Sequence, residues 1–151
     1  GTDITLLTTG ICTEESLLVS NKLREMGVAI QHLHITTLKP FEDNLIKESL
    51  SKAKYGIITM ENHTSIGGLG TCVAELIAEY GLNKKLIKVA INDTYLHGAS
   101  QNHLKKEYKL DSKALLSAFE LLIDQKFKIS STDFKKNKSK NFNNINQQEA
   151  L

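Results

Sequence analysis

Residues 55–81 read YGIITMENHTSIGGLGTCVAELIAEYG, and this stretch carries the strongest signal of the fold. Tyr55–Met60 is an apolar run of strand length, which suits a strand buried on both faces. After a polar segment rich in glycine, apolar residues return at helical spacing at Val73, Leu76 and Ile77, and Gly81 ends the pattern. A strand, a loop and a helix in this order predict one unit of a parallel α/β sheet.

The same alternation continues on both sides of this stretch. Strands are expected at residues 4–9, 28–35, 55–60 and 86–91. Helices are expected at residues 13–26, 44–53, 71–79, 103–108 and 112–122, with Asp43 and Asp111 as N-caps of two of them. Short strands that alternate with helical patterns predict an open, mostly parallel sheet with helices on both faces. We therefore expect one α/β domain over residues 3–127.

Length and composition exclude several classes of protein. A chain of 151 residues with 24% charged and 40% hydrophobic residues suits one globular domain. It has no window of 18 apolar residues and no visible signal peptide, so we expect no membrane partner. Two cysteines without zinc-type spacing fit a reducing cytoplasm. Since the first residue is Gly1, we expect one module of a longer polypeptide.

The C-terminal residues differ in composition from the rest. Residues 124–151 hold six lysines and three acidic residues, which leaves residues 1–123 with a net charge of −1. Residues 128–151 are rich in lysine and asparagine and offer little apolar area to offset the entropy cost of ordering, so we expect a disordered tail. No aromatic residues interleave with the charges as in nucleic-acid-binding segments, so no nucleic-acid partner is expected.

The segment 61–71 is the candidate site. It lies between the carboxyl end of a strand and the start of a helix, where open α/β sheets bind ligands. Its glycines either permit a tight turn and close helix packing, or let the backbone approach an anion at the helix N-terminus. The residues that we single out for an anion or interface loop are Glu61, His63, Gly67, Gly68, Gly70 and Thr71.

Other chemistries fit the sequence less well. Gly68 and Gly70 with Asp93 further on are similar to a dinucleotide-binding fingerprint, but its third glycine is a valine. Glu61 and His63 have no second histidine or cysteine pair nearby, so no metal site is expected. Cys12 and Cys72 lie at or near helix starts, which can lower a thiol pKa, although small buried side chains are the commoner role of cysteine.

Four blocks resemble the transketolase C-terminal domain and follow one another along the chain in the same order as in that family. Residues 61–70, ENHTSIGGLG, match its E-x-H-x-x-x-G-G-L-G stretch. The others are TTG at 8–10, TLKPF at 37–41, and a closing block made of NDTY at 92–95, HGAS at 97–100 and YKLD at 108–111. The closing block departs from the family pattern, because Lys109 stands where a glycine is usual. The resemblance covers residues 4–123.

This resemblance implies both a fold and a function. The fold is a three-layer α/β/α domain with a five-stranded sheet in which one strand is antiparallel. The parent enzyme would be a transketolase that moves ketol units between sugar phosphates with thiamine diphosphate and Mg²⁺. The alternatives are another thiamine diphosphate enzyme, namely deoxyxylulose phosphate synthase or a 2-oxo acid dehydrogenase beta subunit, or a stand-alone nucleotide-binding domain.

The resemblance also implies a supporting role for this domain. The sequence has no G-D-G…N run to hold Mg²⁺ and diphosphate, so we expect the isolated domain to be inactive and to bind no thiamine diphosphate. Its expected partners are the remaining domains or an N-terminal subunit of the enzyme, and a second copy in a homodimer. Asp93 and Ser100 are expected to fix the last crossover of the chain.

Overall fold

The computed structural model describes residues 1–130 and 133–134, and within them strands and helices alternate as the sequence predicts. Their order along the chain is β1 (Ile4–Thr8), α1 (Cys12–Glu25), β2 (Ile30–His34), α2 (Asn44–Lys52), β3 (Gly56–Thr64), α3 (Leu69–Glu79), β4 (Leu86–Ile91), α4 (Gln101–Glu107) and α5 (Ser112–Ile123). The α/β class and the parallel sheet are thereby confirmed.

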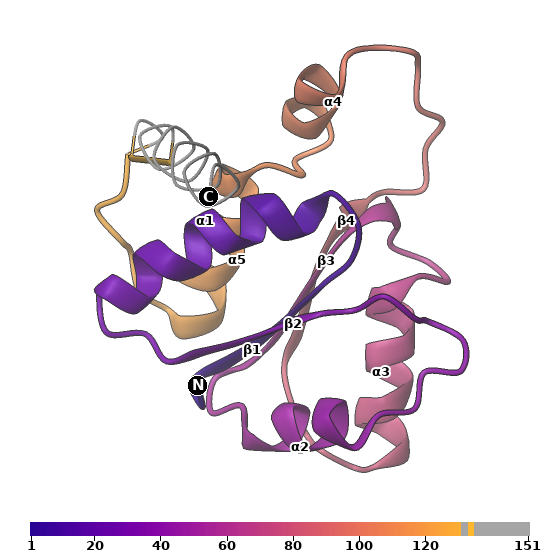
Figure 1. The fold of residues 1–151 in the computed structure, drawn as a ribbon, viewed down its shortest axis with the longest axis vertical. Coiled ribbons are helices and arrows are strands. Elements are labelled where there is room, and N and C mark those ends of the chain that lie inside the picture. The colour runs from indigo at the N-terminus through magenta and orange to yellow at the C-terminus, as the bar shows by residue number, and fades with distance from the viewer. Residues whose placement is uncertain (131–132, 135–151) are drawn as a thin grey trace, which may run out of the picture.

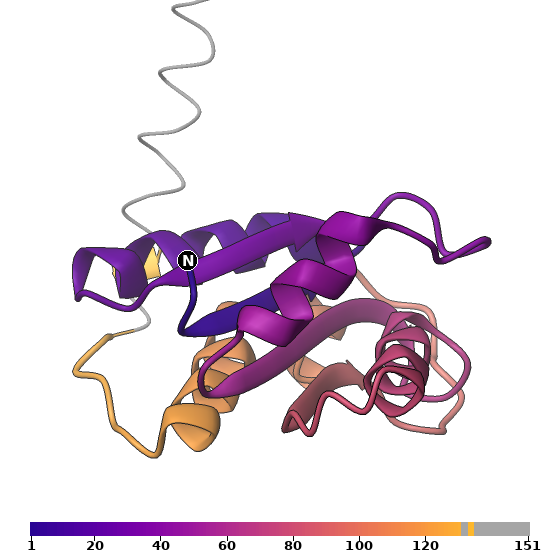
Figure 2. The ribbon, with the colours of Figure 1, turned by 90° about the horizontal axis from the view of Figure 1, so that it is seen from below.

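The four strands form a parallel sheet in the order β2-β1-β3-β4. Helices α1 and α5 cover one face of this sheet, and α2 and α3 cover the other (Figure 1). Figure 2 shows the sheet from the side that α2 and α3 cover, with the strands twisted relative to one another. Helix α4 lies beyond the carboxyl ends of the strands, after the long loop that follows β4 (Figure 1).

Alternate side chains of the central strands supply two separate cores. On β1, Leu6 faces the core under α1 and α5, while Leu7 faces the core under α2 and α3. On β3, Ile58 faces the core under α1 and α5, and Ile57 faces the core under α2 and α3. All four are fully buried, which is why these strands read as continuous apolar runs. Both faces of the sheet are therefore needed for stability.

The expected five-stranded sheet with one antiparallel strand is wrong for the described residues, because β4 is the last strand there. The apolar residues after α5 do not pair with the sheet. The N–H of Phe127 donates to the Glu120 carboxylate at 2.9 Å, and that of Ile129 donates to the Phe127 carbonyl at 2.9 Å. Phe127 instead packs its ring into the first core, where it is buried.

Two helix starts agree with the sequence, and one strand end does not. Asp43 caps α2 by accepting from the N–H of Leu45, and Asp111 caps α5 by accepting from the N–H of Ala114, so both predicted caps are confirmed. By contrast, β3 continues four residues past Met60, through a register shift against β4, and α3 begins at Leu69. The loop between them is therefore shorter than predicted.

The described residues contain no helix that is long and apolar enough to cross a membrane. The predicted tail, residues 128–151, lies almost entirely outside the described residues. Where it is described, Ile129 and Phe134 pack against the core under α1 and α5.

Candidate functional site

Glu61 is the central residue of the predicted loop, and it lies within β3. The alternation of the strand places it on the same face as Ile57 and Thr59, under the N-terminus of α3. Its carboxylate accepts from two backbone N–H groups, Leu69 to Oε2 at 2.7 Å and Gly70 to Oε1 at 2.8 Å. The side chain is 1% exposed. Glu61 therefore caps α3 with a buried negative charge.

The glycines let the loop close around this carboxylate. A Cβ on Gly68 would lie 2.0 Å from Glu61 Oε2, so no side chain fits there while Glu61 holds its position. Gly70 brings α3 close to the sheet, since a Cβ there would lie 2.8 Å from the Lys88 side chain. Gly67 has φ +77 and donates its N–H to Thr71 Oγ1 at 2.9 Å. Gly67, Gly68, Gly70 and Thr71 thus all serve the turn.

The outer side of the loop faces solvent. His63 is exposed, and its Nδ1 lies 3.3 Å from the carbonyl of Thr64, its neighbour in the chain. Ile66 is 67% exposed although it is a large apolar residue. We call residues 62–67, which are exposed except for the half-buried Thr64 and Ser65, the β3–α3 rim. Ile66 is its one large apolar side chain, and it lies at the carboxyl edge of the sheet.

The second predicted group, Asp93 and Ser100, lies in the loop that connects β4 to α4. Every residue from 92 to 100 is exposed, and Tyr95 is fully so. Ser100 is the N-cap of α4, and its carbonyl accepts from the N–H groups of His103 and Leu104, but its side chain forms no cap hydrogen bond. The structure therefore does not bring Asp93 and Ser100 together with Glu61.

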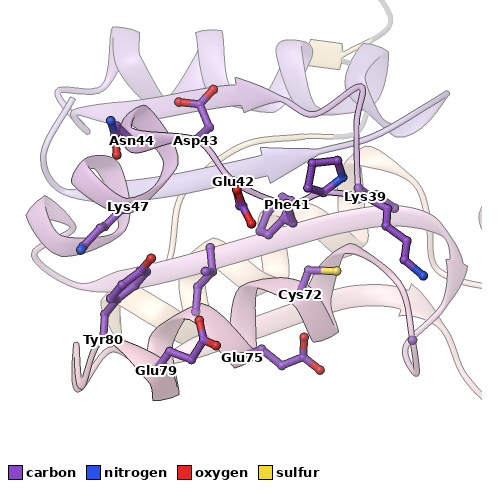
Figure 3. A pocket seen from close by; sticks show the side chains of 14 residues that line it. Lys39, Phe41, Glu42, Asp43, Asn44, Lys47, Cys72, Glu75, Glu79 and Tyr80 are labelled. Atoms are coloured by element: carbon purple, nitrogen blue, oxygen red, sulfur yellow. The ribbon is translucent and has the colours of Figure 1, made fainter.

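A groove of about 910 Å³ lies between the loop after β2 and helix α3, and the sequence did not predict it. Figure 3 shows Phe41 on one side of it and Cys72 on the other. Its lining holds charged residues of both signs: the acidic Glu42, Asp43, Glu75 and Glu79, and the basic Lys39 and Lys47. The groove reaches Gly67 and so is continuous with the β3–α3 rim. No local pattern of the sequence marks this groove, because its two walls come from separate segments of the chain.

Neither cysteine is activated by its helix. Burial raises the pKa of Cys12 to about 12, even though Lys105 nearby lowers it in part. Burial also raises the pKa of Cys72, with a smaller contribution from Glu75. The alternative of a helix start that lowers a thiol pKa is therefore contradicted, and both thiols are predominantly protonated at neutral pH.

A buried ionic group that sequence reasoning missed joins three helices. Glu15 of α1 accepts from Lys105 Nζ of α4 at 3.3 Å and from the hydroxyl of Ser112 at the start of α5. All three residues are buried. The sequence does hold one indication of this group. Glu15 comes three residues after Cys12 and four before Val19, and this helical spacing places Glu15 on the inner face of α1.

The chain was compared with known proteins. A family model described as "Transketolase, C-terminal domain" matches residues 1–115. A transketolase C-terminal section of Methanocaldococcus jannaschii is 38% identical over 115 residues, which are 76% of this chain and 35% of that protein. The 6-deoxy-6-sulfo-D-fructose transketolase subunit SqwH of a Clostridium species is 31% identical over 126 residues, which are 83% of this chain and 38% of that protein.

A solved structure has a similar fold. It is a split-gene transketolase, described as an inactive beta4 tetramer, with a TM-score of 0.71 and 29% identity. The match covers 84% of this chain and 40% of that one. In all three comparisons the chain spans two fifths or less of the length of the protein that it matches.

Proposed function

The chain belongs to the transketolase C-terminal domain family, and from this premise we propose that it forms the last section of a transketolase. The whole enzyme would transfer ketol units between sugar phosphates with thiamine diphosphate and Mg²⁺. The chain itself would be non-catalytic, and its role would be to hold the remaining domains or the N-terminal subunit, and a second copy, in the assembled enzyme.

The chemistry of the candidate site supports a non-catalytic role. The place in the described residues that is most similar to a phosphate cradle is the N-terminus of α3, where two N–H groups point to one spot. Glu61 already fills that spot with its own carboxylate. A diphosphate does not fit there, because it would meet a negative charge and find both donors engaged. We derive no catalytic step through thiamine diphosphate from these residues.

The same observation separates the two roles considered for the loop. A regulatory anion would need free N–H groups at the start of α3, and Leu69 and Gly70 direct theirs to Glu61. The outer side carries the exposed apolar side chain of Ile66. Because the donors on the inner side are engaged and the outer side exposes the apolar side chain of Ile66, we favour an interface over an anion site. The exposure of Ile66 on the rim is the single observation that carries this assignment.

Two further features support the proposal of a partner. The chain matches only 35% and 38% of its relatives' lengths, so the rest of such an enzyme would have to come from elsewhere. The loop at residues 92–100, at the same edge of the sheet, also exposes Tyr95 and Leu96.

Both cysteines are free, which agrees with the proposed cytoplasmic location.

The test is reconstitution with the N-terminal section that completes the enzyme. Ketol transfer to a sugar phosphate is expected only when both sections are present, and the chain alone should show no thermal shift with thiamine diphosphate and Mg²⁺. Activity of the chain alone, or a shift of several degrees at saturating cofactor, would overturn the non-catalytic role.

A matched pair of variants tests the rim. Ile66→Asp should weaken assembly, measured by sedimentation velocity, and activity should fall with it. Leu121→Asp is the control, since Leu121 is similarly exposed, at 64%. Its carbonyl accepts from Lys85 Nζ, and Lys85 comes just before β4, so Leu121 lies at the opposite edge of the sheet. Equal effects of the two variants would exclude a specific role for the rim.

A further inference from the structure

Three potential metal ligands from two segments meet at α4. His103 and Glu107 lie one turn apart on the helix, and His97 comes from the exposed loop before it. One coordinating atom from each residue lies within 4.8 Å of the other two. We propose that His97, His103 and Glu107 form a binding site for a zinc-type transition-metal ion, a function separate from assembly.

The distances fit a shared ion. Glu107 Oε2 lies 3.4 Å from His97 Nε2 and 3.3 Å from His103 Nε2. In a tetrahedral zinc site with bonds of about 2.1 Å, neighbouring ligand atoms are separated by about 3.4 Å. Each imidazole therefore already stands at close to this separation from the carboxylate, and the ligand atoms of the two imidazoles lie within 4.8 Å of each other. A fourth position remains for water.

A partner on the second ring nitrogen of His97 orients this side chain for coordination. The hydroxyl of Tyr108 lies 3.4 Å from His97 Nδ1, on the side of the ring away from Glu107. When Nδ1–H donates to this oxygen, Nε2 keeps its lone pair free for a metal. Histidines that bind metals commonly have such a partner on the second ring nitrogen. Tyr108 is half-buried and packs against the core, so it holds a defined position.

The helix that carries two of the ligands is anchored from below. Lys105, between His103 and Glu107 in sequence, points the other way and pairs with the buried Glu15 of α1. The pair fixes which face of α4 is exposed. A bound ion would tie the loop at residues 92–100 to this fixed face, and would thereby order the loop that exposes Tyr95.

The ligand types select the metal. Two imidazoles and one carboxylate suit Zn²⁺, Co²⁺, Ni²⁺ or Cu²⁺, whereas Mg²⁺ and Ca²⁺ prefer sites built from oxygen alone. No metal site was expected from the sequence, because the histidines other than His63 are scattered along the chain. The spacing of His103 and Glu107 on a predicted helix was the signal that pointed to this second place.

The first experiment is a titration of the full chain, without a histidine tag, by calorimetry with ZnCl₂ and by absorption with CoCl₂. We expect one ion per chain, a visible spectrum typical of four-coordinate cobalt, and no competition from excess Mg²⁺. His103→Ala should weaken zinc binding by more than about tenfold, and Tyr108→Phe by about tenfold. His34→Ala is the matched control, because His34 is also exposed but lies on β2.

Two results would overturn the site. One is the absence of saturable zinc binding, which would leave the three side chains as a surface cluster that binds no metal. The other is a dissociation constant that is unchanged by His103→Ala, which would place the ion elsewhere. Hydrogen exchange gives a readout independent of affinity: zinc should slow exchange in residues 94–99 of the original chain and not of the His103→Ala variant, whose fold is checked by circular dichroism.

Discussion

Glu61 and Gly68 are coupled, because the space that Gly68 leaves is filled by the Glu61 carboxylate. The three atoms nearest to a Cβ on Gly68 all belong to Glu61, and the backbone of Gly68, at φ −102, is open to any residue. Gly68→Ala should therefore destabilise the chain by displacing the cap. We expect a loss of about 2 kcal/mol, close to that of Glu61→Gln, which leaves one N–H group without an acceptor.

A double-mutant cycle tests this coupling by urea denaturation. In a Glu61→Ala background, Gly68→Ala should cost at least about 1 kcal/mol less than it does alone. Gly67→Ala is the control: its cost of about 1 kcal/mol comes from φ +77, with no atom within 4 Å of the new Cβ, and should be the same in both backgrounds. Additive losses for Glu61 and Gly68 would contradict the geometry.

His32 makes the stability of the chain depend on pH. Burial, together with Arg24 and His34, lowers the pKa of His32 to about 4, and its Nε2 lies 2.9 Å from Thr8 Oγ1. The unfolded chain, with an ordinary histidine pKa of about 6.5, binds the proton more readily. The contribution of His32 to the free energy of unfolding is therefore fully present above about pH 6.5 and is lost as the pH falls towards 4.

Denaturation at a series of pH values measures this loss. Since His32 is partly exposed, we expect about 1 to 2 kcal/mol of it to come from this residue. The His32→Gln variant should lose that part of the slope between pH 4 and 6.5, while His34→Gln should keep it. An unchanged slope in His32→Gln would assign the acid sensitivity to other groups.

At the scale of elements, most of the strands and helices could be predicted because their signals are local. Apolar runs marked β1 and β4, and Asp43 and Asp111 marked two helix starts. The end of β3 could not be predicted, since Glu61 reads as a polar loop residue until α3 is placed above it to supply two donors. The fifth strand was carried over from the resemblance, with no apolar run in this sequence to support it.

Helix α4 depends on a contact that sequence patterns cannot reveal, because Glu15 and Lys105 are far apart in the chain. The pair is buried, and removal of Lys105 takes a charged partner away from the buried Glu15 carboxylate. Lys105→Met should therefore destabilise the chain by about 3 kcal/mol in urea denaturation. Adding Glu15→Gln should restore much of that loss. Lys106→Met, an exposed neighbour, should change the stability by less than about 0.5 kcal/mol.

This pair also determines how α4 is presented. Amide exchange in residues 101–107 should accelerate in Lys105→Met, because the helix loses its main polar anchor to α1. If exchange there stayed at the original rate while stability fell, the ion pair would act on α5 through Ser112 and not on α4.

For the whole molecule, the informative surfaces lie at one edge. The β3–α3 rim, the groove beside α3 and the loop at residues 92–100 all follow the carboxyl ends of the strands or border them, whereas the two cores are closed by four helices. The sequence singled out two residues of the rim, His63 and Gly67, through a contiguous motif. It could not predict the groove, whose walls are formed by segments about 30 residues apart that meet only in the fold.

If the proposed partner covers this edge of the sheet, the rate at which a thiol reagent modifies Cys72 should fall. Cys72 is half-buried in the wall of the groove, whereas Cys12 is fully buried with its pKa raised to about 12. In the chain alone, a small thiol reagent at pH 8 should modify Cys72 slowly and Cys12 only on unfolding. In the reconstituted enzyme, modification of Cys72 should slow further, and a Cys72→Ser variant should lose this phase altogether. A Cys72 rate that is equal in the two states would place the partner elsewhere and leave the groove open in the assembled enzyme.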